Sequence, residues 1–178
     1  INDTKIKNYF SEKSSEISSM NSMQLLRIKK LFGEFDENYA NHLLRYEKAL
    51  KQRNELLKND FLSKDALFSW HLLLAKYGTE LNTLRKQFIT EINQELTPTY
   101  RSIAENNDEV TINYKSELQD ITEQKYLKTL EENFEKDSYI GHTTFGIHHD
   151  DYIFEFNHKP ADGSASRGET RSIILALD

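Results

Sequence analysis

The hydrophobic positions of this chain recur every three or four residues over most of its first half, which is the period of an amphipathic helix. One such run extends from about residue 21 to Phe61, and a second begins after Ser63 and extends to Leu96. Pro98 is expected to end or kink the second helix. The first run comprises Leu25, Ile28, Phe32, Phe35, Tyr39, Leu43, Tyr46, Leu50, Leu57 and Phe61, and the second comprises Leu67, Trp70, Leu74, Tyr77, Leu81, Leu84, Phe88, Ile92 and Leu96.

Two long helices joined by a short polar turn can bury their apolar faces against one another as an antiparallel hairpin. Ser63 is the candidate N-cap of the second helix, and Trp70 is expected to pack against the first helix. Gly33 and Asp36 are the positions at which the first helix could be interrupted. The pattern therefore predicts a helical hairpin over residues 21–105.

The pattern is mixed on either side of this hairpin. Residues 1–20 hold a weak strand signal followed by a Ser-rich, Glu-rich and Lys-rich linker. Residues 106–178 hold a turn, strands and shorter helices. The predicted elements of this last part are a strand at 110–114, a helix at 123–134, a second sheet segment at 143–157 with Ile153, Phe154 and Phe156, and a turn at 159–163. The fold class that follows is α+β and mostly helical.

The last helix has the strongest start signal in the chain. Ser166 is a candidate N-cap, and Glu169 follows it at the spacing of a capping box. An apolar run from Ile173 to Leu177 follows. A helix that opens on Ser and Gly presents free backbone N–H groups to phosphate oxygens. The alternative is an ordinary capped helix that packs on a sheet.

The densest basic run lies in the first helix. It allows two interpretations: a solvated face whose charges pair with Glu47 and Glu55, or a strip that contacts phosphates. The net charge of −6 means that any contact with nucleic acid must depend on such a local patch. The candidate residues for DNA binding are Arg45, Lys48, Lys51, Arg53 and Lys58.

Four histidines, His142, His148, His149 and His158, lie close to Asp150 and Asp151. A metal site is not expected, because adjacent residues on a strand point to opposite faces and so His148 and His149 could not easily reach one ion. Ser166 lacks the G-x-S-x-G pattern of a serine hydrolase. The chain also has no cysteine, no long apolar run and no signal-peptide pattern, so a soluble, cytoplasmic protein is expected.

The chain contains no G-x-x-x-x-G-K-[ST] loop, so by itself it is not expected to hold the β- and γ-phosphates of a nucleotide or their Mg²⁺. The run from Ser172 to Asp178 imitates the acidic Walker B strand. We reject that interpretation because the run continues the helix that Ser166 caps. The chain alone is expected to be inactive as an ATPase.

Three segments resemble motifs of known proteins. Residues 165–171 (ASRGETR) resemble the L-S-x-G-Q signature of ABC-type ATPases. Residues 146–151 (GIHHDD) resemble the G-P-H-R-D-D element of the RecF family, and residues 45–57 resemble its R-Y-x-x-x-L-K-Q-R-N-x-L-L run. The likeness to the RecF family spans nearly the whole chain. The departures are Ile147 for the usual Pro, His149 for the usual Arg and Glu169 for the usual Gln.

The resemblance implies a helical lobe inserted into a P-loop ATPase head, together with the part of the head that bears the signature. It further implies an ATP-dependent DNA-binding protein of recombinational repair, with ATP and Mg²⁺ as cofactors of the full-length protein. DNA at single-strand/duplex junctions, a second copy in an ATP-dependent head-to-head dimer and recombination mediator proteins of the same pathway would be its partners. Ser166, Arg167, Gly168 and Glu169 would contact the nucleotide of the other subunit. The alternative is a non-enzymatic coiled-coil or interaction module of an SMC-like protein.

Overall fold

The computed structural model describes residues 38–59, 64–161, 169, 172, 173, 176 and 177. Several predictions fall outside these residues. They concern the strand and linker of residues 1–20, the interruption at Gly33 or Asp36, the cap at Ser63 and the signature residues Ser166, Arg167 and Gly168.

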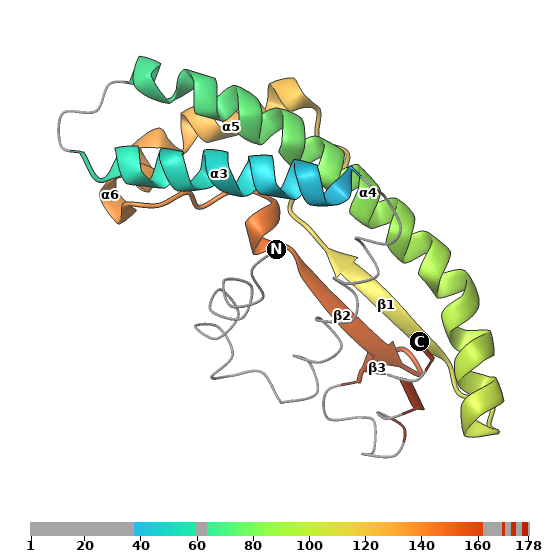
Figure 1. The fold of residues 1–178 in the computed structure, drawn as a ribbon. Coiled ribbons are helices and arrows are strands. Elements are labelled where there is room, and N and C mark those ends of the chain that lie inside the picture. Colours follow the sequence, from blue (N-terminus) through green and yellow to red (C-terminus); the bar gives the residue numbers. More distant parts are fainter. Residues whose placement is uncertain (1–37, 60–63, 162–168, 170–171, 174–175, 178) are drawn as a thin grey trace. The chain divides into compact units, whose positions relative to one another are not determined.

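The described elements follow the order of an α+β fold (Figure 1). They are α3 (Tyr39–Leu57), α4 (Lys64–Ala104), β1 (Val110–Lys115), α5 (Glu123–Glu132), α6 (Phe134–Ile140), the 3₁₀ helix η1 (Ile147–His149), β2 (Asp151–Phe156) and β3 (Lys159–Pro160). The chain divides into two compact units. One comprises Phe35–Phe88 and Tyr114–Asp151, and the other comprises Ile1–Glu34, Ile89–Asn113 and Tyr152–Asp178.

The predicted helical hairpin is confirmed by the contacts between α3 and the first half of α4. Leu57 packs with Leu67 in one buried cluster, whereas Arg45 of α3 bonds to Tyr77 further along α4. The end of α3 therefore contacts the start of α4, and an earlier residue of α3 contacts a later residue of α4. This order of contacts is that of an antiparallel pair. The buried positions of α3 are Tyr39, Tyr46, Ala49, Arg53 and Leu57, and Leu67, Leu74 and Leu81 of α4 are completely buried.

One prediction about α4 needs correction, and one of the two alternatives at Pro98 is excluded. Trp70 is only half-buried, and Leu67 and Leu74 on either side of it form the buried seam instead. Helix α4 does not end near Pro98 but runs through it to Ala104. Pro98 cannot donate to the carbonyl of Gln94, four residues earlier, and both residues are exposed. Burial of Leu96 and Tyr100 keeps the helix in place on both sides of the proline.

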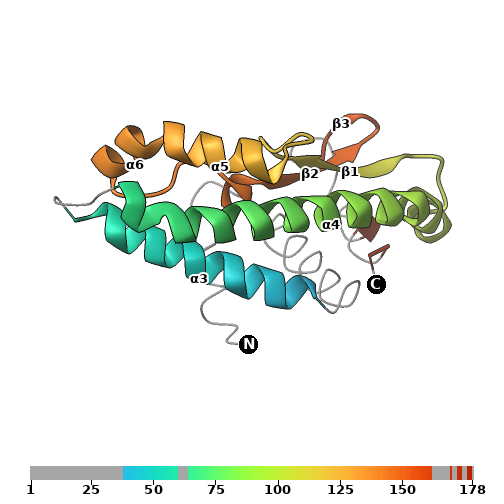
Figure 2. The same cartoon turned by 90° about the horizontal axis from the view of Figure 1, so that it is seen from above.

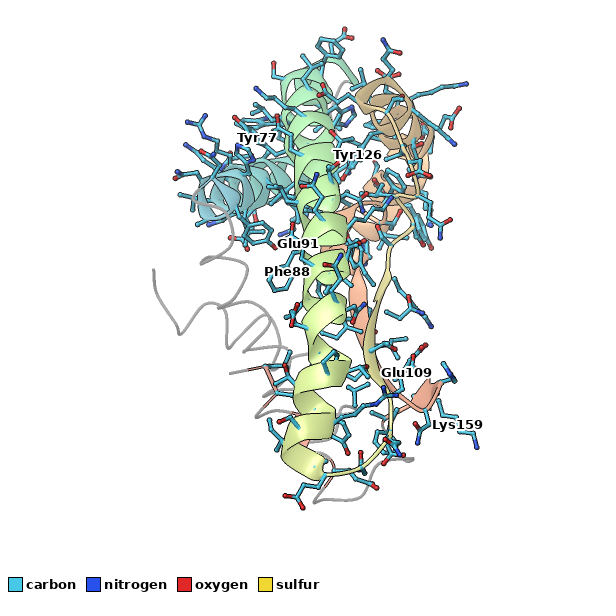
Figure 3. The ribbon with its side chains drawn as sticks, turned by 90° about the vertical axis from the view of Figure 1, so that its right-hand side faces the viewer. Tyr77, Phe88, Glu91, Glu109, Tyr126 and Lys159 are labelled. Carbon is cyan, nitrogen blue, oxygen red and sulfur yellow. The ribbon has the colours of Figure 1, made fainter. Side chains whose placement is uncertain are left out.

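Helices α5 and α6 complete the helical unit. The side chain of Thr122 caps α5 by accepting a hydrogen bond from the backbone N–H of Lys125 at 3.2 Å. Gly141, in the left-handed conformation with φ of 81°, ends α6. Figure 2 shows α3 on one side of α4 and α5 with α6 on the other, and Figure 3 shows Tyr77 and Tyr126 on these two sides. Helix α6 was not predicted from the sequence.

The sheet has the strand order β1-β2-β3. The strand at β1 was predicted almost to the residue, but the segment predicted to be extended over residues 143–157 contains a strand only at β2. The chain turns at Asn157 and His158, which have φ of 49° and 63°, and Lys159 and Pro160 of the predicted turn form β3 instead. Residues 162 and 163 of that predicted turn lie outside the described residues.

In the second unit, side chains of α4 complete the hydrogen bonding of β1. Asn93 donates to the carbonyl of Ile112 and accepts from its N–H, both at 2.8 Å. Thr97 does the same for Val110 through its hydroxyl group. A strand edge without such partners would offer its backbone to other chains. Among the described residues, no helix is both long and apolar enough to cross a membrane.

Candidate functional site: the two faces of helix α3

Helix α3 has a basic outer face. Lys48, Lys51 and Lys58 are exposed and lie on the side opposite the buried stripe, together with Leu44, whose exposed fraction is 65%. Lys58 forms a solvent-exposed ion pair with Glu55 at 3.3 Å, which contributes little to stability. We call Lys48, Lys51 and Lys58 the lysine face.

Arg45 lies at the edge of this face, towards α4. Its Nη1 donates to the hydroxyl of Tyr77 at 3.2 Å, and its guanidinium lies 5.8 Å from the centre of the Tyr77 ring. This cation–π contact holds the side chain along the α3–α4 seam while the residue remains exposed.

Arg53, the remaining basic candidate, is on the inner face and is completely buried. Its Nη1 donates to Oδ2 of Asp137 at 2.7 Å and to Oγ1 of Thr143 at 2.7 Å, and its Nη2 donates to the carbonyl of Leu130 at 3.3 Å. Burial lowers the pKa of the guanidinium, and the bonds to Asp137 oppose that shift. The exposed basic strip therefore does not include Arg53.

The segment between α6 and β2, residues 141–150, is held against α3 by this network; we call it the connecting loop. Oδ1 of Asn54 accepts from both the backbone N–H and the hydroxyl of Thr143, at 2.8 and 2.7 Å. Oδ1 of Asp137 accepts from the N–H and hydroxyl of Thr144, at 3.0 and 2.7 Å. The backbone N–H and hydroxyl groups of Thr143 and Thr144 thus each have a specific acceptor.

A second hydrogen-bond chain fixes the tautomer of His148. Its Nε2 lies 3.1 Å from the carbonyl of Thr143, which can only accept, so Nε2 carries the proton. Its Nδ1 must then accept from the hydroxyl of Tyr46 at 2.8 Å. Tyr46 in turn accepts from Tyr126 at 3.1 Å, and Tyr126 accepts from the N–H of Ile147.

This chain requires a neutral His148. Burial, and then the neighbouring His149, lowers the pKa of His148 to about 4. Burial also raises the pKa values of Tyr46 and Tyr126, so both phenols keep their protons. The arrangement serves to hold the loop, because none of these groups is poised to exchange a proton near neutral pH.

Gly146 is required where the loop crosses this chain. Its φ is 140°, and a Cβ there would collide with the hydroxyl oxygens of Tyr46 and Tyr126. The glycine of the G-I-H-H-D-D segment therefore allows close approach of the backbone to two buried phenols.

Asp150, at the end of the loop, forms a second buried ion pair. It accepts from Nη1 of Arg85 at 3.0 Å and from the hydroxyl of Tyr114. Arg85 also donates to the carbonyl of Ile147 at 2.9 Å and to the hydroxyl of Tyr39 at 3.1 Å. Burial raises the pKa of Asp150, and its hydrogen bonds oppose that shift.

His148 and His149 were predicted to lie on a strand, and this prediction is wrong. His148 and His149 lie in η1, and their rings are 4.1 Å apart, with both Nε2 atoms directed to the carbonyl of Thr143. Asp150 forms an ion pair with Arg85, and His149 and Asp151 are exposed. In the described part of the chain, no three His, Asp or Glu side chains come together as a metal site.

Of the signature residues, the structure describes Glu169 alone. It is helical and half-exposed, and Ser172 and Ile173 are also helical. The N–H of Ala176 donates to the carbonyl of Ser172 at 3.0 Å, and Ile173 and Leu177 are buried. The described residues between Ser172 and Asp178 are thus helical or in a turn, in agreement with the rejection of a Walker B strand.

Sequence analysis missed the partners that the buried polar network needs. Tyr126 was predicted only as a helix residue and Thr143 only as a strand residue, and Asp137 lay between the predicted elements. One signal was available: Arg53 occupies a position where the hydrophobic period of α3 calls for an apolar side chain. A charge on the buried stripe requires a buried partner of opposite sign.

No family model matches the chain. The chain is 30% identical over 151 residues to the DNA replication and repair protein RecF of Flavobacterium johnsoniae, covering 83% of this chain and 41% of that protein. It is 32% identical over 160 residues to RecF of Natranaerobius thermophilus, covering 81% and 41%. The chain thus spans about two fifths of the length of the curated relatives it matches.

The fold is also similar to a solved structure, that of the recombination mediator protein RecF-ATP in the RecFOR pathway. The TM-score is 0.73 at 25% sequence identity, and the match covers 85% of this chain and 44% of the solved chain.

Proposed function

Since this chain belongs to the RecF family, we propose that it functions in an ATP-dependent DNA-binding protein of recombinational repair, with proteins of the RecFOR pathway as partners. The observation that carries this proposal is the common fold with RecF-ATP over 85% of the chain.

The nucleotide contact is proposed for Ser166, Arg167 and Gly168, with Glu169 beside them. Support comes from the helical conformation of Glu169 and from the burial of Ile173 and Leu177, which anchor a helix at this point. Such a helix would direct its first N–H groups at a phosphate. This sequence itself has no phosphate loop, so these residues would reach ATP and its Mg²⁺ held by a second copy of the full-length protein in a head-to-head dimer.

The DNA contact is proposed for the lysine face and Arg45. The DNA proposed to bind there is a junction between single-stranded and duplex DNA. Support comes from the exposure of Lys48, Lys51 and Lys58 on the side of α3 away from its core. Arg45 is exposed at the edge of that side. A side chain that contacts a phosphate must be accessible to solvent. Arg53 is completely buried, so it is not among the proposed DNA-binding residues.

The nucleotide contact is tested by Ser166→Arg in the full-length protein that bears this sequence. A bulky side chain there would fill the space of the γ-phosphate oxygens, so ATP binding by the monomer should persist while ATP-dependent dimerisation and hydrolysis are lost. A group supplied in trans can contribute roughly 10³–10⁵ in rate. The assays are sedimentation with and without ATP, ATP affinity, turnover and melting temperature.

The matched control is Ser69→Arg at an exposed position of α4, which should leave dimerisation unchanged. If the Ser166→Arg protein still dimerises with ATP and loses only about 1 kcal/mol of stability, Ser166 is a helix cap and nothing more. If the unmodified protein shows no response to ATP, the alternative of a non-enzymatic SMC-like interaction module is favoured.

A further inference from the structure

The lysine face and the inner polar residues lie within about three helical turns, from Tyr46 to Lys58, the C-cap residue of α3. Arg53 lies five residues from both Lys48 and Lys58, which places it about 140° around the helix axis from each. Any ligand that fixes the lysine face therefore also fixes the orientation of the inner side chains.

Three inner residues of α3 hold the connecting loop. Asn54 accepts from the N–H and hydroxyl of Thr143, and Arg53 donates to the same hydroxyl at 2.7 Å. Tyr46 donates to His148 at 2.8 Å. Thr143 has an exposed fraction of 1%, so water cannot replace these bonds while the loop stays in place.

We propose that Tyr46, Arg53 and Asn54 are positioning residues through which α3 transmits DNA binding at the lysine face to the connecting loop. The inference rests on the proposed DNA contact. For the loop to open, Thr143 must separate from both Arg53 and Asn54. A duplex laid across the lysines restricts the movements of α3 that permit this separation, so it binds the closed state better than the open one. The ratio of these two affinities is the strength of the coupling.

Two backbone amides report the state of the loop separately. The N–H of Thr143 is bonded to Asn54 of α3, whereas the N–H of Thr144 is bonded to Asp137 of α6. NMR measures the hydrogen-exchange rates of both amides, with and without a saturating duplex oligonucleotide. In the unaltered protein, the duplex should slow the exchange of Thr143 roughly fivefold or more.

The variant that tests the route is Asn54→Ala, because Asn54 is half-buried and uncharged and its loss should not unfold the protein. The Thr143 amide should exchange faster without DNA, and its slowing by the duplex should disappear. Duplex affinity should stay as it is, since the closed loop remains the dominant state and the lysine face is intact. Because Asn54 is itself the acceptor of the Thr143 N–H, the discriminating readout is the Thr144 amide, which keeps its bond to Asp137 in this variant. Its slowing by the duplex should also disappear, whereas a merely structural role of Asn54 would leave that response in place.

The matched control is Asn93→Ala, since Asn93 also makes two bonds to the backbone, but to Ile112 of β1. This variant should keep the response of Thr143. If the duplex binds and the exchange of Thr143 does not change, or if the response survives Asn54→Ala, the transmission is refuted while the DNA contact stands. If no duplex binds the lysine face, the DNA contact fails and the inference fails with it.

Discussion

Single residues decide whether the polar groups inside this helical unit are tolerated. Arg53 interrupts the apolar stripe of α3, yet every bond it forms ends on a buried acceptor: Asp137, Thr143 or the carbonyl of Leu130. A buried ion pair of this kind adds little net stability over an apolar pair, but the loss of one partner leaves the other charge stranded. The pair therefore specifies which segment may lie against α3.

The first prediction follows from this asymmetry. Arg53→Met should lower the free energy of unfolding by about 3–5 kcal/mol, because Asp137 is then buried without a cation. Lys51→Met on the exposed face of the same helix should stay within about 0.5 kcal/mol. Urea denaturation of both variants measures the difference. A loss below about 1 kcal/mol for Arg53→Met would mean that the network carries no structural role.

The second prediction concerns pH. The pKa of His148 falls from 6.5 to about 4 in the folded protein, chiefly through burial, and His71 shifts in the same direction for the same reason. The unfolded chain therefore takes up protons below about pH 6.5, whereas the folded chain does so only near pH 4. The contribution of these two histidines to the free energy of unfolding should fall through this window as the pH is lowered and level off below it.

The contribution of His148 to this loss is on the order of 3 kcal/mol at pH 4. His148→Gln cannot be protonated, so urea denaturation between pH 7 and pH 4 should show a correspondingly smaller loss for that variant. Equal losses for the two proteins would show that His148 is not held neutral by the fold.

At the scale of elements, periodicity found the helices but not the side that each buries. Helix α4 contacts α3 on one side and α5 on another, so its buried positions spread beyond one stripe (Figures 2 and 3). Tyr126 of α5 packs against Gly78, a residue that no apolar pattern would select. For this reason Trp70, which fits the period, lies at the edge of the packing, and His71 beside it is buried.

The third prediction compares two side chains of α4. Leu74 is completely buried, so Leu74→Ala should cost about 2–5 kcal/mol of unfolding free energy. Trp70→Ala should cost less than Leu74→Ala, although it removes more atoms, because part of the indole already faces water. Urea denaturation gives the order directly, and a larger loss for Trp70→Ala would contradict the packing described here.

At the scale of the whole molecule, local signals predicted the hairpin, β1 and α5, since each depends on a repeated spacing within one segment. The connecting loop could not be predicted, because its conformation is set by Tyr46, Arg53 and Asn54, which lie some ninety residues earlier. Its apolar and aromatic residues are of the types that are common in strands, which is why a strand was predicted there. The likeness of residues 45–57 and 146–151 to RecF motifs pointed to both segments but not to the bonds between them.

The net charge of the whole chain is −6, so the proposed DNA contact depends on a local attraction by the lysine face. Replacing Lys48, Lys51 and Lys58 together by Gln removes three cations and keeps the helix propensity of α3. If each contacts a phosphate, the slope of log affinity against log salt should fall by about 0.9 per contact.

Duplex binding measured by fluorescence anisotropy over a series of salt concentrations tests this account most directly. The matched control replaces Lys125, Lys128 and Lys136 by Gln, three exposed lysines of α5 and α6 that the account keeps away from DNA. The account predicts weaker binding and a shallower salt slope for the lysine-face variant, with the control equal to the unaltered protein. Equal slopes and affinities for all three proteins would contradict a DNA contact on α3.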